Sequence, residues 1–444
     1  MKSETVVLLI NPWIYDFSAY DLWSKPLGLL YLGSLFKNAG YKVKLIDCLD
    51  HFHPELPEEP EKKLYGCGHY YWEDVEKPPV YKHIPRKYKR YGYPLALFKK
   101  ELKNLKSPPQ AILITSIMTY WYPGVFKAIE IIRDYFKDVP IILGGIYATL
   151  CYEHALKYSE ADYVIRYGQG REILRLVDEI VGNKRSDYRQ FPQTFLEYPY
   201  PAYELLRERR YICLLTSYGC PFRCSYCASW LLESKFLQRQ PQGVVEEINY
   251  WHKKFGVKNF AFYDNALLVD AENHLCLILE EIIRREIKCF FHTPNGLHIR
   301  FISWEVADLL FKANFKTIRL SLETTNSRRQ QISGGKVSNL EFKQAITNLL
   351  NAGYNKKDIG VYIMCGLPGQ DEDEVEAGII FLRNLGVKIK LVEYSPIPGT
   401  KEWEKGVREF GFDPIADPLL HNNSALPFLS RERYNRLKNL CVGE

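Results

Sequence analysis

The sequence predicts an α/β protein in two parts, a doubly wound parallel sheet followed by a partial (β/α)6 barrel of the TIM type. Two series of short apolar strands alternate with amphipathic helices, and glycines follow several of the strands. The chain has 444 residues, enough for two or three domains at roughly 100–200 residues each. We expect the doubly wound domain at 1–185 with an insertion at about 50–110, a linker at 186–209, the barrel at 210–405 and a C-terminal extension at 406–444.

The first series indicates a parallel sheet, because strand-like runs are followed by segments with helical spacing. The segment 27–39, for example, has helical apolar spacing and stops at Gly40, a residue type that often ends helices. The predicted strands are 5–10, 41–47, 111–116, 140–143 and 161–165, and the predicted helices are 27–39, 126–136 and 172–181.

The insertion at 50–110 breaks this alternation. It is rich in Pro, Tyr and Lys, and we interpret it as a long loop or flap with a short helix near 95–105. A long loop inside a compact domain is often functional, so we expect this segment to lie near a binding site.

The second series begins at Tyr211 and contains six strands with intervening helices, which is typical of a partial (β/α)6 barrel. In barrels of this type the chemistry is located at the carboxyl ends of the strands. The predicted strands are 211–217, 258–263, 289–293, 317–322, 359–365 and 388–394, and the predicted helices are 242–255, 271–286, 304–313, 339–352 and 372–385.

Composition and charge exclude several classes of protein. Hydrophobic residues make up 46% and charged residues 25%, as in ordinary globular proteins. The net charge is +6, but basic and acidic residues are interleaved, so we expect no nucleic-acid partner and interpret the basic run at 82–90 as a solvated surface. No apolar run approaches the ~18 residues of a membrane span, and we expect a cytoplasmic protein whose cysteines stay reduced.

Three of the eleven cysteines are clustered just after the first barrel strand. Cys220, Cys224 and Cys227 follow one another at spacings x3 and x2, which lets a compact loop present three thiolates to one face of an iron–sulfur cubane. No fourth cysteine lies nearby, so one iron would stay open for a further ligand. The alternative is a zinc site, for which the nearest additional ligand, His252, falls in a predicted helix.

This segment, with Tyr226 before the last cysteine, resembles the radical S-adenosylmethionine (SAM) superfamily motif, and further motifs recur in order at the barrel strand ends. The resemblance implies a [4Fe–4S] cluster held by the three cysteines, with SAM bound to the open iron and cleaved to a 5′-deoxyadenosyl radical. It also implies that SAM is surrounded by Tyr226, Asp264, Asn295, Glu323 and Gly366.

The N-terminal part resembles the cobalamin-binding, Rossmann-like domain that precedes many radical SAM barrels. The matching residues include 8–12, 25–32, 143–145 and 162–165. The resemblance implies that a corrin or substrate site is lined by Asn11, Ser116, Tyr120, Gly144 and Gly145. No Asp-x-His-x-x-Gly pattern occurs, so no histidine is placed to bind cobalt from below. The bulky residues after Ser116 would form the apolar floor of a corrin site, or alternatively fill its space.

The leading functional hypothesis is therefore a cobalamin-dependent radical SAM methyltransferase that acts on an unactivated carbon. The alternative is a cobalamin-independent radical SAM enzyme that catalyses cyclisation, rearrangement or another carbon–carbon bond formation. The expected partners are a small-molecule or lipid-like substrate and an electron donor such as flavodoxin or ferredoxin.

Overall fold

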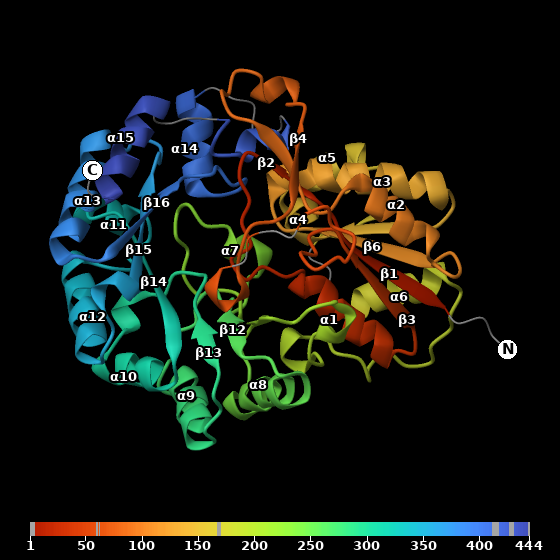
Figure 1. Cartoon of the computed structure of the whole chain (residues 1–444), viewed down its shortest axis with the longest axis horizontal. Helices are drawn as coiled ribbons and strands as arrows, with labels where there is room; N and C mark the ends of the chain where they lie inside the picture. The colour runs from red at the N-terminus through yellow and green to blue at the C-terminus, as the bar shows by residue number, and fades with distance from the viewer. Residues whose placement is uncertain are drawn as a thin grey trace. The chain divides into compact units, whose positions relative to one another are not determined.

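The computed structural model describes residues 5–58, 61, 63–166, 170–410, 417–425 and 430–442. The chain divides into two compact units, and Figure 1 labels most of their helices and many of their strands. Unit 1 consists of Met1–Arg209 and Ile415–Ala425, and unit 2 consists of Arg210–Pro414 and Leu426–Glu444. The segment expected to be a linker, 186–209, falls within unit 1, and the C-terminal extension is divided between the two units.

Unit 1 contains a five-stranded parallel sheet of order β3-β1-β6-β7-β8. In chain order the strands are therefore arranged 2-1-3-4-5, and the order reverses between β1 and β6. In sheets of this topology, ligands bind outside the carboxyl ends of the strands at such a switch point. The predicted doubly wound sheet is confirmed, with strands β1 (Val6–Asn11), β3 (Lys42–Asp47), β6 (Ala111–Ser116), β7 (Ile141–Gly144) and β8 (Tyr163–Val164).

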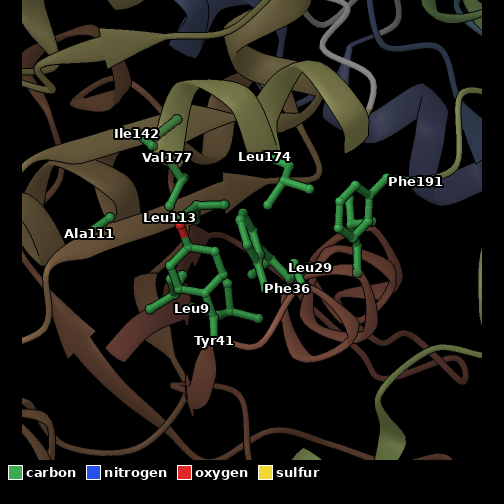
Figure 2. Packing of buried hydrophobic residues seen from close by; sticks show 13 residues of the cluster. Leu9, Leu29, Phe36, Tyr41, Ala111, Leu113, Ile142, Leu174, Val177 and Phe191 are labelled. Atoms are coloured by element: carbon green, nitrogen blue, oxygen red, sulfur yellow. The ribbon is translucent and has the colours of Figure 1, made fainter. Parts of the chain in front are cut away.

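One face of this sheet is covered by α1 (Leu27–Asn38) and α6 (Gly170–Ile180). Figure 2 shows side chains of the sheet, such as Leu9 and Leu113, among side chains of these helices, such as Phe36 and Leu174. This buried apolar surface stabilises the unit. Helices α3 (Tyr122–Tyr135), α4 (Gly145–Leu150) and α5 (Tyr152–Tyr158) lie outside this cluster, and α3 and α4 contact β6.

The insertion is more ordered than the sequence indicates. It contributes β4 (Trp72–Val75) and β5 (Tyr88–Tyr91), which form an antiparallel sheet of order β2-β5-β4 with β2 (Ile14–Asp16). The predicted short helix is α2 (Leu95–Lys103), and brief 3-10 turns lie at Leu64–Gly66 and Pro79–Tyr81. Our interpretation of 50–110 as a loop or flap missed this sheet, because each strand is short and its partner is distant in sequence.

Unit 2 contains the six predicted barrel strands in the order β16-β15-β14-β13-β12-β9, all parallel. Among the described residues β9 and β16 are not paired, so the sheet is open. The strands are β9 (Ile212–Leu214), β12 (Asn259–Phe262), β13 (Phe290–His292), β14 (Phe315–Glu323), β15 (Ile359–Cys365) and β16 (Lys388–Glu393). The predicted helices are α8 (Pro241–Phe255), α9 (Leu275–Arg284), α10 (Trp304–Lys312), α12 (Asn339–Asn351) and α13 (Glu372–Leu385).

Local signals explain where several of these helices begin and end. The Ser338 side chain accepts a hydrogen bond from Glu341 N, and the Glu341 side chain accepts one from Ser338 N, which forms a capping box at the start of α12. Helices α8 and α13 end at glycines in the left-handed conformation, Gly256 and Gly386. The remaining elements of unit 2 include α7 (Ser229–Leu232), α11 (Ser327–Ile332), α14 (Lys401–Phe410) and α15 (Arg431–Val442).

Candidate functional site

The three clustered cysteines lie in a loop closed by a short antiparallel pair of strands. Strand β10 (Ser217–Tyr218) precedes the loop and pairs with β11 (Leu237–Gln238), which follows it. Gly219 has a φ of +81°, and a Cβ at this position would lie 2.1 Å from the carbonyl oxygen of Lys235. Only glycine fits this turn, so the loop depends on Gly219 for its closure.

The cysteine side chains are free thiols, with Cys224 buried and Cys220 and Cys227 half-buried. Burial, together with the neighbouring thiols, raises the pKa of Cys220 to about 11. A metal binds the thiolate, so loading iron at this loop must release protons. Among the described residues no three His, Cys, Asp or Glu side chains are grouped to hold a single metal ion. His252, the residue weighed as an extra zinc ligand, lies in α8, with its Nδ1 2.8 Å from the carbonyl oxygen of Val257.

The cysteine loop is anchored to three other segments of unit 2. Ser225 N donates to the carbonyl oxygen of Ser333 at 3.1 Å, and Ser225 Oγ donates to Glu402 Oε1 at 2.7 Å. Phe222, between the first two cysteines, stacks on His298 with 4.7 Å between ring centroids. These contacts hold the loop from both sides at the carboxyl end of β9.

Glu323 lies at the end of β14 and forms an ion pair with Lys336, with Nζ 2.9 Å from Oε1. The Lys336 ammonium also lies 5.6 Å from the ring centroid of Tyr226. Burial alone would lower the pKa of Lys336, but the charges of Glu323 and Cys224 outweigh burial and raise this pKa. Sequence analysis named Tyr226 and Glu323 but missed Lys336. Its position directly after Gly334 and Gly335, in a glycine turn, is the sequence feature that could have pointed to it.

Asp264 follows β12 and holds the end of β9. Its Oδ1 accepts hydrogen bonds from the backbone and the hydroxyl of both Thr216 and Ser217, with hydroxyl distances of 2.8 and 2.6 Å. Its Oδ2 is buried and has no hydrogen-bond partner within the described part of the chain. Burial raises the pKa of Asp264. One oxygen therefore fixes the backbone, and the other is available to a donor group from a ligand.

Asn295 follows β13, which neighbours β12, and Gly366 follows β15. Asn295 Nδ2 donates to the carbonyl oxygens of Tyr263 at 2.9 Å and Asp264 at 3.2 Å, which ties the two strand ends together. Gly366 has a φ of +83° directly after β15. The structure thus brings Tyr226 and Glu323 together through Lys336, and joins Asp264 to Asn295, whereas Gly366 shares only the carboxyl edge of the sheet.

In unit 1 the predicted residues lie at the carboxyl ends of neighbouring strands. Asn11 ends β1 and donates from Nδ2 to Asp47 Oδ1 at 2.7 Å, while Ser116 ends β6 and donates from Oγ to the carbonyl oxygen of Met118 at 2.8 Å. A Cβ on Gly145 would lie 2.6 Å from Ser116 O, whereas nothing lies within 4 Å of a Cβ placed on Gly144. The backbone at Gly144 is therefore open to a ligand.

Tyr120 lies in a 3-10 turn, Thr119–Trp121. The C-terminal segment covers this turn, which sequence analysis did not predict. Residues 417–425 return to unit 1 and pack on this turn, with His421 Nδ1 3.0 Å from Thr119 Oγ1. Buried Asp16 accepts hydrogen bonds from Trp121 Nε1 at 2.8 Å and from Asn422 Nδ2 at 2.9 Å. The bulky residues after Ser116 are therefore held rigidly by the protein itself.

A cavity of about 170 Å³ lies on the β3 side of this edge, within unit 1. Asp47, which receives the Asn11 hydrogen bond, lines it. Its wall also includes an ion-paired group in which Arg207 lies 3.0 Å from Asp50 and 2.8 Å from Glu101. The chemistry of this cavity is polar, and sequence analysis did not predict it.

Comparison with known proteins identifies the second unit. Residues 214–382 match the family model of the Radical SAM superfamily. The chain is 24% identical over 329 residues to an uncharacterized methyltransferase of Pyrococcus horikoshii, an alignment that covers 68% of this chain and 70% of that protein. It is 25% identical over 199 residues to the anaerobic magnesium-protoporphyrin IX monomethyl ester cyclase of Rubrivivax gelatinosus, covering 37% of this chain and 36% of that one.

Solved structures show the same fold across both units. The radical SAM methyltransferase TsrM of Kitasatospora setae, solved with cobalamin and a [4Fe–4S] cluster, superposes with a TM-score of 0.71 at 15% identity, covering 98% of this chain and 91% of that one. The cobalamin-dependent radical SAM enzyme OxsB gives a TM-score of 0.58 at 14% identity, covering 92% of this chain and 56% of that one. Within the described residues, no helix has the length and apolar character needed to span a bilayer.

Proposed function

We propose that this chain, a member of the radical SAM superfamily through its domain at 214–382, is a cobalamin-dependent methyltransferase that acts on an unactivated carbon. The observation that carries this proposal is the likeness of the whole chain, at a TM-score of 0.71 over 98% of its length, to a radical SAM methyltransferase solved with cobalamin and a [4Fe–4S] cluster. The sequence relative in Pyrococcus horikoshii, whose name is that of a methyltransferase, supports the same class.

The donor set of the cysteine loop fits a [4Fe–4S] cluster. Cys220, Cys224 and Cys227 would hold it, because three free thiols share one closed loop and are near enough to influence one another's ionisation. When bound, the cluster supplies the electron that cleaves SAM into methionine and a 5′-deoxyadenosyl radical. The chain itself presents the thiols and fixes the loop through Gly219 and Ser225.

The strand-end residues fit SAM binding. Asp264 keeps a buried oxygen without a partner, which suits a ligand donor such as an amino group. Lys336 places a buried cation beside Tyr226, which suits the ligand's carboxylate. Asn295, Glu323 and Gly366 complete the same carboxyl edge and would fix the orientation of the cofactor.

The carboxyl edge of unit 1 fits a corrinoid whose lower face meets no histidine. Asn11 and Ser116 flank the switch point, Gly144 leaves the backbone open, and Tyr120 stands on a turn that the C-terminal segment holds rigidly. When bound, cobalamin supplies the methyl group. The residues of unit 1 would position it, and we propose a small or lipid-like molecule as the substrate.

The alternative function keeps the radical chemistry without cobalamin. The support is for the cyclisation part alone: two relatives are named as cyclases, the magnesium-protoporphyrin IX monomethyl ester cyclase above and GTP 3′,8-cyclase of Aquifex aeolicus, at 28% identity over 191 residues. Because these matches cover 37% and 42% of this chain, they say less about unit 1 than the whole-chain likeness does.

An external reductant is required, and we propose an electron donor of the flavodoxin or ferredoxin type. Arg223 lies between two of the cluster cysteines and its side chain is exposed, 4.9 Å from the Trp230 ring. A positive charge at this point would attract an acidic carrier protein. All eleven cysteines are free, which supports a reducing compartment such as the cytoplasm.

The visible absorption spectrum tests the proposal first. Protein is produced anaerobically in cobalamin-fed cells, reconstituted with iron and sulfide, and freed of unbound cofactor by gel filtration. Corrin bands that co-elute in stoichiometric amount with a broad iron–sulfur shoulder support the methyltransferase. The shoulder alone supports the cobalamin-independent alternative. Loss of the shoulder in Cys224→Ala, but not in Cys441→Ser on α15, is expected if the loop holds the cluster.

A further inference from the structure

The inner face of the barrel sheet carries basic side chains on β14 and β16. Ile318 and Leu320 of β14 lie beside Ile359 and Val361 of β15. These four residues belong to the opposite, outer face of the sheet, which packs against the helices. Ile363, in the same alternation, has its Cδ1 3.4 Å from the position that a Cβ on Gly378 of α13 would take. Successive strand residues point to opposite faces, so Arg319 and Tyr362 point inward.

Arg319 and Lys390 both lie over Gly360. A Cβ placed on Gly360 would be 3.9 Å from Arg319 Cγ and 3.8 Å from Lys390 Cγ. The φ of Gly360 is not positive, so its backbone conformation does not require glycine. The missing side chain instead lets two basic residues, on the two strands that flank β15, approach each other over Gly360. Tyr362 stands next to them, in register with Lys390.

The Arg319 guanidinium has no acidic partner among the described residues. Its Nη1 donates to the hydroxyl of Tyr362 at 3.0 Å, and this hydroxyl donates in turn to the carbonyl oxygen of Pro294 at 3.3 Å. Arg319 Nε is buried without a hydrogen-bond partner in the part of the chain that the structure describes. Arg319 as a whole is half-buried, but a buried guanidinium nitrogen without a partner is costly, so this arrangement favours an anion from outside the protein.

Two titratable residues on the strands near Arg319 do not compensate its charge. His292 is buried near the same wall, and burial, helped by the charge of Arg319, lowers its pKa to about 3, so its ring is neutral. Glu323, at the end of the same strand, is already paired with Lys336. The edge of the guanidinium formed by Nε and Nη2 has the geometry that binds carboxylate or phosphate through two parallel hydrogen bonds.

We infer that this wall, defined by Arg319, Tyr362, Gly360 and Lys390, binds an oxyanion of the substrate, so that the substrate carries a carboxylate or phosphate group. The inference rests on the proposed function only in placing the substrate at the inner face of the radical SAM barrel. It is independent of methyl transfer and of cobalamin.

Binding of inorganic phosphate tests the inference without turnover or corrinoid. Calorimetric titrations use the full-length, cluster-loaded protein at constant ionic strength, with acetate as a second probe. We expect Arg319→Gln to raise the phosphate Kd at least tenfold and Tyr362→Phe to raise it severalfold. The matched control is Lys357→Gln, an exposed lysine in the turn before β15 that is not part of the wall, which should bind as the wild type does.

Three results would overturn the inference. The first is a wild-type protein that binds neither anion, or an Arg319→Gln variant that binds like the wild type. The second is loss of phosphate binding when SAM is saturating, which would assign the cation to the carboxylate of SAM. The third is a melting temperature several degrees lower for Arg319→Gln than for the wild type, because the fold would then depend on this guanidinium. Arg319→Lys keeps the charge but lacks the two parallel N–H donors, so it should also raise the phosphate Kd, and wild-type affinity in this variant would overturn the bidentate site.

Discussion

The ammonium of Lys336 and the carboxylate of Glu323 lie 2.9 Å apart at the point where the cysteine loop meets the end of β14. Glu323 has a φ of +66°, and the pairing of β14 with β15 shifts register between Ser321 and Glu323. A bulge of this kind redirects a side chain, here toward the lysine. The pair therefore links the strand end to the cluster loop.

We expect Lys336→Met to destabilise unit 2 by about 3 kcal/mol, because it leaves the Glu323 carboxylate buried without a partner. SAM should also bind more weakly. Chemical denaturation and equilibrium binding of SAM measure the two effects. In the double variant Lys336→Met with Glu323→Gln, much of the lost stability should return; equal stability of the single variant and the wild type would contradict the role of the pair.

Gly219→Ala should prevent cluster loading. The added methyl would lie 2.1 Å from the Lys235 carbonyl oxygen, in a conformation that alanine rarely adopts, so the loop must open. Iron and sulfide content per chain, with the iron–sulfur absorbance, measures the loss. Gly243→Ala is the matched control, since nothing lies within 4 Å of that added Cβ in α8 and alanine favours a helix by roughly 0.5–1 kcal/mol. Normal iron content in Gly219→Ala would show that the loop tolerates the change.

The C-terminal segment should detach from unit 1 in mild acid. Burial, with a contribution from His154, lowers the pKa of His421 to about 3, below its ordinary value of 6.5. Below pH 6.5 the unfolded segment binds a proton that the folded one does not. The free energy that holds the segment on unit 1 therefore has its full value above pH 6.5. It decreases toward pH 3, by up to about 1.4 kcal/mol per pH unit.

Amide hydrogen exchange of 417–425, corrected for intrinsic rates, measures this opening. His421→Gln removes the titrating group, and its opening free energy should be less sensitive to pH between 6.5 and 4.5 than that of the wild type. Parallel pH profiles for the two proteins would rule out His421 as the cause.

Charge reversal at Arg223 should slow reduction of the cluster by flavodoxin hydroquinone at least tenfold at low salt and weaken the salt dependence of that rate. Reduction by dithionite should change far less, because a small reductant needs no docking surface. Stopped-flow absorbance follows both rates in Arg223→Glu. Lys357→Glu makes the same charge change at the other end of the barrel strands, and an equal effect there would point to net charge rather than to docking.

Sequence periodicity was enough to predict both sheets. The five strands of the parallel sheet in unit 1 and the six of the parallel sheet in unit 2 are short apolar runs followed in most cases by amphipathic helices, and this local pattern is visible without any tertiary contact. The spacing of Cys220, Cys224 and Cys227 likewise fixed the position of the cysteine loop.

Only the tertiary structure decided which distant segments meet. The sheet formed by β2, β4 and β5 joins residues 14–16 to residues 72–75 and 88–91, and Asp16 binds Asn422 across most of the chain length. The proposed role of Lys336 depends on its ion pair with Glu323. The proposed role of Arg319 depends on its position near Gly360 of β15 and Lys390 of β16. Local spacing records which face of an element is apolar, whereas these contacts arise from side-chain packing and charge compensation between elements, which no local pattern contains.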